Sequence, residues 1–381
     1  MFVKILTMHR IINYGSFLQA YALMKIIESY GHNVEFCDFV AGEARHNGSK
    51  VQPPSLFDRL KEASLAPFTH LKKRKFFKET KKCFHNIAWK ELKLTKENNL
   101  SYTCDCLVVG SDEVFNYTQN HGFGYVPQFF GHGLDASSIF AFAASAGYAN
   151  IKDIENDNME NEIGSGLNKF SSISVRDENT YDIVEKYSRH KPSQVIDPTL
   201  LYDFELETNA KHKKFNKKRY LIIYAYTGRL DTKKDIKVIK EYTKKNNLTT
   251  ISLGFFHGWC DHNLVVTPFE LLSLFKDAEA VLTDTFHGSI FSIKFKKPFV
   301  SLLRVTNKKG SNSNKLGYLL TQLGLQDRIN HSLEELESQM NKPIDYDHVC
   351  KTIQKYKKDS IQFMTDALDK AKKDVMEITK S

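Results

Sequence analysis

The stretch AEAVLTDTFHGSIFSIKFKKPFVSLL, from Ala278 to Leu303, decides the fold. Residues 279–283 form a short apolar run that predicts a buried strand, and Asp284 and Thr285 then supply oxygens that can cap a helix. An apolar pattern of helical period begins at Phe286, and Pro298 ends that helix before a second apolar run. A strand, a turn, a helix and another strand form half of a doubly wound α/β unit.

The predicted helix begins with His287, Gly288 and Ser289, at the point where such folds bind ligands. Free backbone N–H groups and the positive end of the helix dipole favour an anion there, Gly288 would let it approach closely, and His287 can carry a proton to or from it. The alternative stays open that the Thr-Asp-Thr segment only caps the helix and that His287 is an ordinary loop histidine.

Length and composition predict a two-domain globular protein. The chain has 381 residues, 41% hydrophobic and 26% charged, without an apolar run near the roughly 20 residues of a membrane span and without a signal-type amino terminus. We therefore expect a cytoplasmic location. The six cysteines lack metal-ligand or disulfide spacing, so we expect no metal. The net charge of +9 suits anionic partners without choosing among small molecules, membrane surfaces and nucleic acids.

The amino-terminal region predicts a strand at 2–8 and a helix at 16–30, with Asn13, Tyr14 and Gly15 in the turn between them. Such a turn can cradle a phosphate or a sugar hydroxyl with its backbone, although simple turn chemistry explains the same residues.

A second strand end carries carboxylates. The apolar run 104–109 leads into Gly110, Ser111, Asp112 and Glu113, where an open α/β sheet places groups that handle substrate. The alternative is a turn in which Asp112 caps the next helix.

A third strand, 171–175, leads into Arg176. A guanidinium extended over the strand ends would suit a carboxylate or phosphate, whereas a local pair with Asp177 or Glu178 is the competing interpretation.

Domain boundaries follow from composition. We expect a Rossmann-like domain at 1–207 with a basic helical insertion at about 55–100, a linker at 208–218, a second domain at 219–345 and a long helix at 346–381 that packs back across both. The basic segment at 70–82 can lie against anionic lipid at the inner face of the membrane, or be a solvated helix whose phenylalanines pack on the body.

Seven segments together resemble the polysaccharide pyruvyl transferase family, in its order, from about Asn13 to Ile329. They are NYGSFLQAYAL, VVGSDEVFN, AFAASAG, ISVRDE, VIDPTLL, TPFELLSLFKDAEAVLTDTFHGSIFSIKFKKPF and LGLQDRI. The resemblance implies a glycosyltransferase-B-like fold, two facing Rossmann-like domains with the site in the cleft between them. It also implies transfer of pyruvate from phosphoenolpyruvate to a sugar of a bacterial cell-surface polysaccharide, capsule or cell-wall glycan, or its lipid-linked precursor.

The resemblance also implies residue roles. Arg176 corresponds to the arginine associated with the anionic donor, and His287 to the expected donor-site and catalytic histidine. Asp112 is our candidate base. The scheme forms a ketal and releases phosphate, needs no cofactor besides the donor, and gives no reason to expect nucleic-acid binding.

The chain departs from the family pattern in two segments: Glu113 and Phe115 replace the usual Gln and Trp of GSDQVWN, and NKL replaces the common SRI, with Lys315 in place of the arginine. The first two bear on acceptor choice, and Lys315 keeps the donor-site charge without bidentate geometry. Two alternative functions remain open: a glycosyltransferase of the same fold that uses a nucleotide sugar, and a non-catalytic glycan-binding subunit of a capsule assembly complex.

Overall fold

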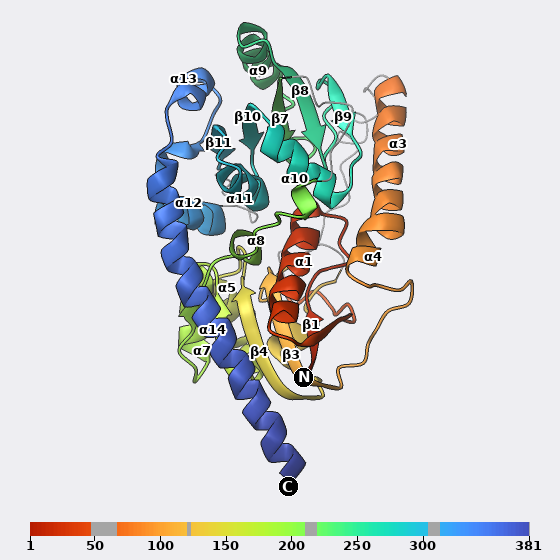
Figure 1. Cartoon of the computed structure of the whole chain (residues 1–381), viewed down its shortest axis with the longest axis vertical. Coiled ribbons are helices and arrows are strands. Elements are labelled where there is room, and N and C mark those ends of the chain that lie inside the picture. Colours follow the sequence, from red (N-terminus) through yellow and green to blue (C-terminus); the bar gives the residue numbers. More distant parts are fainter. Residues whose placement is uncertain (47–66, 120–122, 210–218, 304–312, 381) are drawn as a thin grey trace.

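The computed structural model describes residues 1–46, 67–119, 123–209, 219–303 and 313–380. Within them the chain forms two parallel sheets of six strands each, stacked one above the other in Figure 1. The first sheet consists of β1 (Phe2–Leu6), β2 (Asn33–Cys37), β3 (Cys104–Asp112), β4 (Ala136–Ala144), β5 (Ser172–Val175) and β6 (Ser193–Gln194). The second consists of β7 (Tyr220–Tyr224), β8 (Thr249–Leu253), β9 (His262–Leu264), β10 (Ala280–Thr283), β11 (Phe299–Leu302) and β12 (Ile329–Asn330).

Helices and short helical turns connect the strands. The α-helices are α1 (Tyr14–Ser29), α3 (Pro67–Cys83), α4 (Trp89–Glu91), α5 (Ile151–Asn156), α6 (Glu160–Leu167), α7 (Glu178–Tyr187), α8 (Pro198–Leu201), α9 (Lys233–Lys245), α10 (Pro268–Asp277), α11 (Phe286–Lys294), α12 (Tyr318–Gln322), α13 (Leu336–Asn341) and α14 (Tyr346–Lys380). Single turns of 3₁₀- or π-helix lie at Phe84–Ala88, Pro127–Phe130, Glu207–Asn209, Ser313–Gly317 and Gln326–Arg328.

Each sheet reverses its strand order once. The orders are β2-β1-β3-β4-β5-β6 and β12-β11-β10-β7-β8-β9, so the reversals fall between β1 and β3 and between β7 and β10. Leu6 pairs with Val109 at the end of the first reversal, and Tyr224 pairs with Thr283 at the end of the second. A crevice opens where neighbouring parallel strands send their connections in opposite directions, so each sheet offers one ligand-binding edge.

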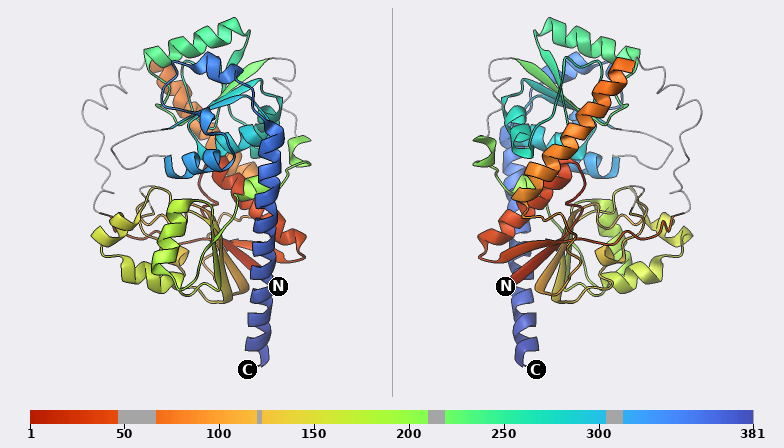
Figure 2. Two further views of the ribbon diagram at one scale, coloured as in Figure 1. Left: turned by 90° about the vertical axis from the view of Figure 1, so that its left-hand side faces the viewer. Right: turned by 90° about the vertical axis from the view of Figure 1, so that its right-hand side faces the viewer.

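The predicted long carboxy-terminal helix is confirmed as α14, which runs along both sheets (Figures 1 and 2). The Tyr346 hydroxyl donates to the Lys297 carbonyl of the second sheet's domain at 2.5 Å. Further along, the Ser360 hydroxyl accepts the Ile196 N–H at 3.0 Å, and Phe363 contacts two phenylalanines of β4. The expected glycosyltransferase-B-like arrangement, two facing Rossmann-like units joined by this helix, is therefore confirmed.

The basic helix expected near 70–82 is α3, and it packs on the second sheet's domain (Figure 1), although it belongs to the first half of the chain. The Phe76 ring is buried 5.8 Å from the Phe256 ring, whereas Phe77 and Leu71 are 40% and 62% exposed. One phenylalanine thus packs on the body and the other does not. Residues 55–66 of the expected insertion lie outside the described residues, and across the described ranges no helix is long and apolar enough to cross a membrane.

The packing of α14 on the first sheet leads to a stability prediction. Met364 of α14 is fully buried in the core that contains β3 and β4. Met364→Ala should lower the free energy of unfolding by about 2–5 kcal/mol, because it leaves a cavity in a close-packed core. Urea denaturation measures this loss. Lys358→Ala, an exposed change on the same helix, should stay within about 0.5 kcal/mol of the parent, and equal effects of the two changes would contradict the packing.

Candidate functional site

A cavity of about 560 Å³ lies where the two ligand-binding edges face each other. The first sheet contributes residues after β1, β2 and β3, and the second contributes residues after β7, β8 and β10 together with Lys315. Its lining comprises Met8, His9, Arg10, Ile11, Ile12, Asn13, Ser16, Asp38, Phe39, Asp112, Glu113, Gln119, Phe123, Tyr224, Tyr226, Phe255, Thr285, Phe286, His287 and Lys315.

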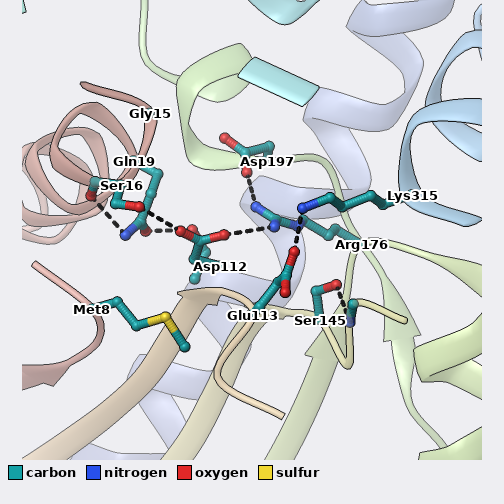
Figure 3. A network of polar contacts seen from close by, with 12 residues as sticks. Met8, Gly15, Ser16, Gln19, Asp112, Glu113, Ser145, Arg176, Asp197 and Lys315 are labelled. Carbon is teal, nitrogen blue, oxygen red and sulfur yellow. Dashed lines mark hydrogen bonds and ion pairs between the residues drawn. The ribbon is translucent and has the colours of Figure 1, made fainter. Parts of the chain in front are cut away.

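Arg176 lies behind this cavity and joins three strand ends of the first sheet (Figure 3). One terminal nitrogen donates to Asp112 Oδ1 at 2.9 Å and the other to Asp197 Oδ2 at 2.5 Å. The arginine side chain is 1% exposed. Burial acts to lower its pKa, but Asp197 and Asp112 outweigh that effect and raise it. The guanidinium of Arg176 therefore does not extend over an open site, in contrast to the prediction. The alternative, a local pair with Asp177 or Glu178, is not formed either.

Asp112 lines the cavity and is held from two sides. Besides Arg176, the Ser16 hydroxyl donates to its Oδ2 at 2.9 Å. Burial acts to raise the pKa of Asp112, but Arg176, His287 and Lys315 together hold that pKa well below its usual range. A carboxylate in this state accepts hydrogen bonds well and takes up a proton poorly. Its predicted role as base stays a prediction, and the geometry favours an orienting role.

His287 reaches the cavity from the first turn of α11, whose N-cap is Thr285, with its hydroxyl accepting the Gly288 N–H at 2.9 Å. The His287 Nε2 atom lies 3.8 Å from Asp197 Oδ2, and no hydrogen-bond partner for it lies among the described residues. Burial lowers the pKa of His287, although Asp197 and Asp112 act to raise it. The lowered pKa favours the neutral form of the imidazole.

Lys315 and Glu113 form an ion pair between the two domains at the cavity wall (Figure 3). The Glu113 carboxylate also accepts the Asn116 amide at 2.9 Å. Burial acts to raise the pKa of Glu113 and to lower that of Lys315, but their mutual attraction reverses both shifts. Two positions at which the chain departs from the family pattern are thus direct partners. The third, Phe115, packs in the first sheet's core between Phe130 and Phe170.

A second charged group lies at the other end of the cavity. Arg10 donates to both oxygens of Asp38 at 2.6 and 3.1 Å, and the His9 Nε2 atom lies 3.2 Å from Asp38. Burial acts to raise the pKa of Asp38, but the adjacent His9 and Arg10 hold that pKa well below its usual range. Five aromatic residues also line the cavity: Phe39 and Phe123, which contact each other, and Tyr224, Tyr226 and Phe255, which form a second group.

The predicted turn after β1 is formed, but its amide groups are occupied. Asn13 Oδ1 accepts the N–H groups of Gly15 and Ser16 at 2.8 and 3.2 Å, so it acts as the N-cap of α1. Tyr14 is buried and donates to the Val266 carbonyl at 2.7 Å. A Cβ atom on Gly15 would stand 2.2 Å from His287 Nδ1. The turn therefore caps α1, as the turn-chemistry alternative predicts. It also joins the two domains and packs against His287, which helps to position that side chain.

The other predicted glycines and serines lie outside the lining. A Cβ on Gly288 would meet the Thr283 hydroxyl at 2.2 Å, so the glycine is required by protein packing rather than by close approach of an anion. Ser289 exchanges a 2.7 Å hydrogen bond with Ser301. Gly110, at φ +127°, faces the Phe142 carbonyl, and the Ser111 hydroxyl donates to Gln19 at 2.5 Å.

Some lining residues were missed from the sequence although a signal was present. His9 and Arg10 follow β1, and Asp38 follows β2, so the strand-end rule that identified Asp112 applies to them as well. Tyr226 and Phe255 follow β7 and β8 in the same way. No group of three or more metal-ligating side chains occurs among the residues that the structure describes.

The geometry defines a two-domain α/β protein with a cleft site, and comparison with known proteins is consistent with that class. Among solved structures, the UDP-N-acetylglucosamine 2-epimerase from Rickettsia bellii is similar with a TM-score of 0.51 and 9% identity, over 97% of this chain and 96% of that one. The UDP-GlcNAc 2-epimerase from Neisseria meningitidis, bound to UDP-GlcNAc, is similar with a TM-score of 0.47 and 9% identity, over 97% of this chain and 99% of that one. At this identity the likeness to the Rickettsia bellii enzyme concerns the fold alone.

Sequence comparison places the chain in a family. The family model for polysaccharide pyruvyl transferase matches residues 13–304, which is most of the chain. A search of curated proteins found no significant match. The chain therefore belongs to the polysaccharide pyruvyl transferase family, a family of transferases, and the resemblance drawn from its motifs is confirmed.

The contacts of Arg176 lead to a second prediction. Arg176→Met should lower the free energy of unfolding at neutral pH by about 3–5 kcal/mol, because it leaves Asp112 and Asp197 buried without their counter-ion. Denaturant unfolding measures the loss. Arg189→Met removes an exposed arginine of the same domain and should stay within about 0.5 kcal/mol of the parent. A variant as stable as the parent would show that Arg176 is not required as a counter-ion.

Proposed function

We propose that the protein transfers the pyruvyl group of phosphoenolpyruvate to a sugar of a cell-surface polysaccharide or of its lipid-linked precursor, with release of phosphate. The observation that carries this proposal is the placement of His287, whose Nε2 atom is without a hydrogen-bond partner among the described residues, beside the Lys315 ammonium in one interdomain cavity. Family membership supports the reaction class.

The reaction needs proton movement and charge stabilisation. A proton adds to the vinyl methylene of the donor, one sugar hydroxyl attacks the resulting oxocarbenium-like carbon, phosphate leaves, and a second hydroxyl closes the ketal. Two protons leave the hydroxyl groups, one ends on the new methyl group and one on phosphate. The balance therefore needs a group that gives and regains a proton, and cations near the departing phosphate.

His287 is suited to proton transfer because binding of the donor changes its protonation state. Its lowered pKa leaves it neutral in the free protein. An anionic donor in the cavity favours the imidazolium and raises that pKa, so the histidine gains its proton when the donor binds. It then donates to the methylene carbon and accepts a proton from a sugar hydroxyl.

The cavity has room for both substrates. The charged wall of Asp112, Glu113, His287 and Lys315 suits the reacting groups. The aromatic side chains of the lining suit the apolar faces of a sugar ring, and Asp38 and Arg10, which also line the cavity, can bind its hydroxyl groups. A small donor and a glycan acceptor can therefore lie side by side between the domains. Peripheral contact of the exposed basic face of α3 with the inner membrane surface would bring a lipid-linked acceptor within reach.

The central test uses phosphoenolpyruvate with a panel of lipid-linked and synthetic glycosides. Mass spectrometry should detect an added pyruvate ketal, with equimolar phosphate release. Parallel reactions with nucleotide sugars test the alternative activity. Release of nucleoside diphosphate without ketal formation would identify a glycosyltransferase and overturn the proposal.

Replacement of the histidine gives a sharper test. His287→Asn should lower kcat roughly 10²–10⁴-fold, the range expected for a lost general acid or base. His331→Asn, which changes an exposed histidine, should leave kcat unchanged. Full activity of the His287 variant would remove the histidine from the mechanism.

Proton uptake tests the neutral state of His287. Because the free imidazole has a lowered pKa and an anionic ligand raises it, donor binding should take up protons, and donor affinity should rise as the pH falls towards that pKa. Titration calorimetry in buffers of different ionisation enthalpy measures the uptake. His287→Asn should abolish the part due to this residue. Equal proton uptake by the variant and the parent would show that the ligand, and not His287, takes up the protons.

A further inference from the structure

Lys315, a cation of the cavity wall near His287, is held in an ion pair with Glu113. Both side chains line the cavity, and they come from opposite domains. The Lys315 ammonium is 5.8 Å from the centre of the Phe286 ring, which offers no hydrogen bond in its place. In the described part of the chain, Glu113 provides the one hydrogen bond recorded for this ammonium group.

The other cation of this cluster is already committed. Arg176 uses two nitrogens on two carboxylates, and its side chain is 1% exposed against 19% for Lys315. It also lies outside the cavity lining, whereas Lys315 belongs to it. An anion that enters the cavity can therefore reach Lys315 far more readily than Arg176.

The charges around Lys315 favour its release from Glu113 when an anion binds. Asp112, Glu113 and Asp197 bring three negative charges to the cluster, while Arg176 and Lys315 bring two positive charges and His287 is neutral. The cluster already has an excess of negative charge before any ligand arrives. An anionic ligand therefore needs positive charge at this wall, and within this cluster Lys315, the partner of Glu113, is the cation that lines the cavity.

We propose that Glu113 is an internal competitor for the anion site of Lys315, and that a phosphate or carboxylate group of the ligand displaces it when it binds. Glu113 keeps its second anchor, the 2.9 Å hydrogen bond from Asn116, so the carboxylate stays at the wall after displacement. Its freed oxygen can then accept a hydrogen bond from a ligand hydroxyl. The ligand is the donor if the proposed function holds, but the exchange itself depends only on the charge of the ligand.

Binding of inorganic phosphate to three variants tests the exchange. Glu113→Gln removes the competitor and should bind phosphate about tenfold more tightly than the parent, a change of about 1.4 kcal/mol. Lys315→Met should bind it at least about tenfold more weakly. Glu155→Gln breaks an exposed Glu–Lys pair of the same domain, with Lys186, and should not change the affinity. Titration calorimetry measures all three, with thermal unfolding as the check on folding.

The competing explanation is that the pair only fastens the domains together. In that case Glu113→Gln would release Lys315 from its position, and phosphate would bind equally or more weakly, which overturns the proposal. Should the variant fail to fold, a crystal structure of the unaltered protein with phosphate decides. The proposal expects Lys315 Nζ on the anion and apart from Glu113, and an intact ion pair beside bound phosphate would contradict it. Because phosphate binding needs no pyruvyl transfer, this outcome is independent of the central assay of ketal formation.

Discussion

The buried guanidinium of Arg176 is the constraint on which the site depends. A charge that is 1% exposed requires close counter-ions, and Asp112 and Asp197 supply them from the ends of two other strand connections. Asp197 also accepts the Thr199 N–H at 2.9 Å as the N-cap of α8. On its other side the guanidinium lies 4.6 Å from the centre of the Phe286 ring of the second domain. One ion cluster thus fixes three loops and gives the domain interface a surface to pack against.

The cluster also determines the chemical character of the two sides of the cavity. The first domain presents carboxylates whose orientation is fixed, while the second presents an imidazole and an ammonium group, each with fewer restraints. His287 is kept neutral by burial, and Lys315 is held by one carboxylate. His287 and the Glu113–Lys315 pair are therefore the groups whose protonation or pairing can change when an anion arrives, while Asp112 and Asp197 stay fixed by Arg176.

The helices and strands and their order could be predicted well from the sequence. Contacts between elements that are distant in the sequence could not. Hydrophobic periodicity placed α1, α11 and α14 within a few residues. Strand-end reasoning identified Asp112 and His287, and the family resemblance identified Lys315, all three of which line one cavity. It could not tell that Arg176 faces two carboxylates instead of open space, because both partners come from other strand connections. The same applies to Gly288, whose neighbours Thr283 and Tyr224 are set by packing. Local patterns carry information about helices and strand ends, whereas pairings across the sheet depend on topology.

The two domains are interlocked, since α3 from the first half of the chain packs on the second sheet, and α14 from the end of the chain covers the first. Phe140 and Phe142 of β4 find their partner Phe363 only near the carboxy terminus. During synthesis on the ribosome, Phe140 and Phe142 therefore lack this cover until the segment that contains Phe363 has been made. In that interval the nascent chain exposes apolar surface that chaperones can bind.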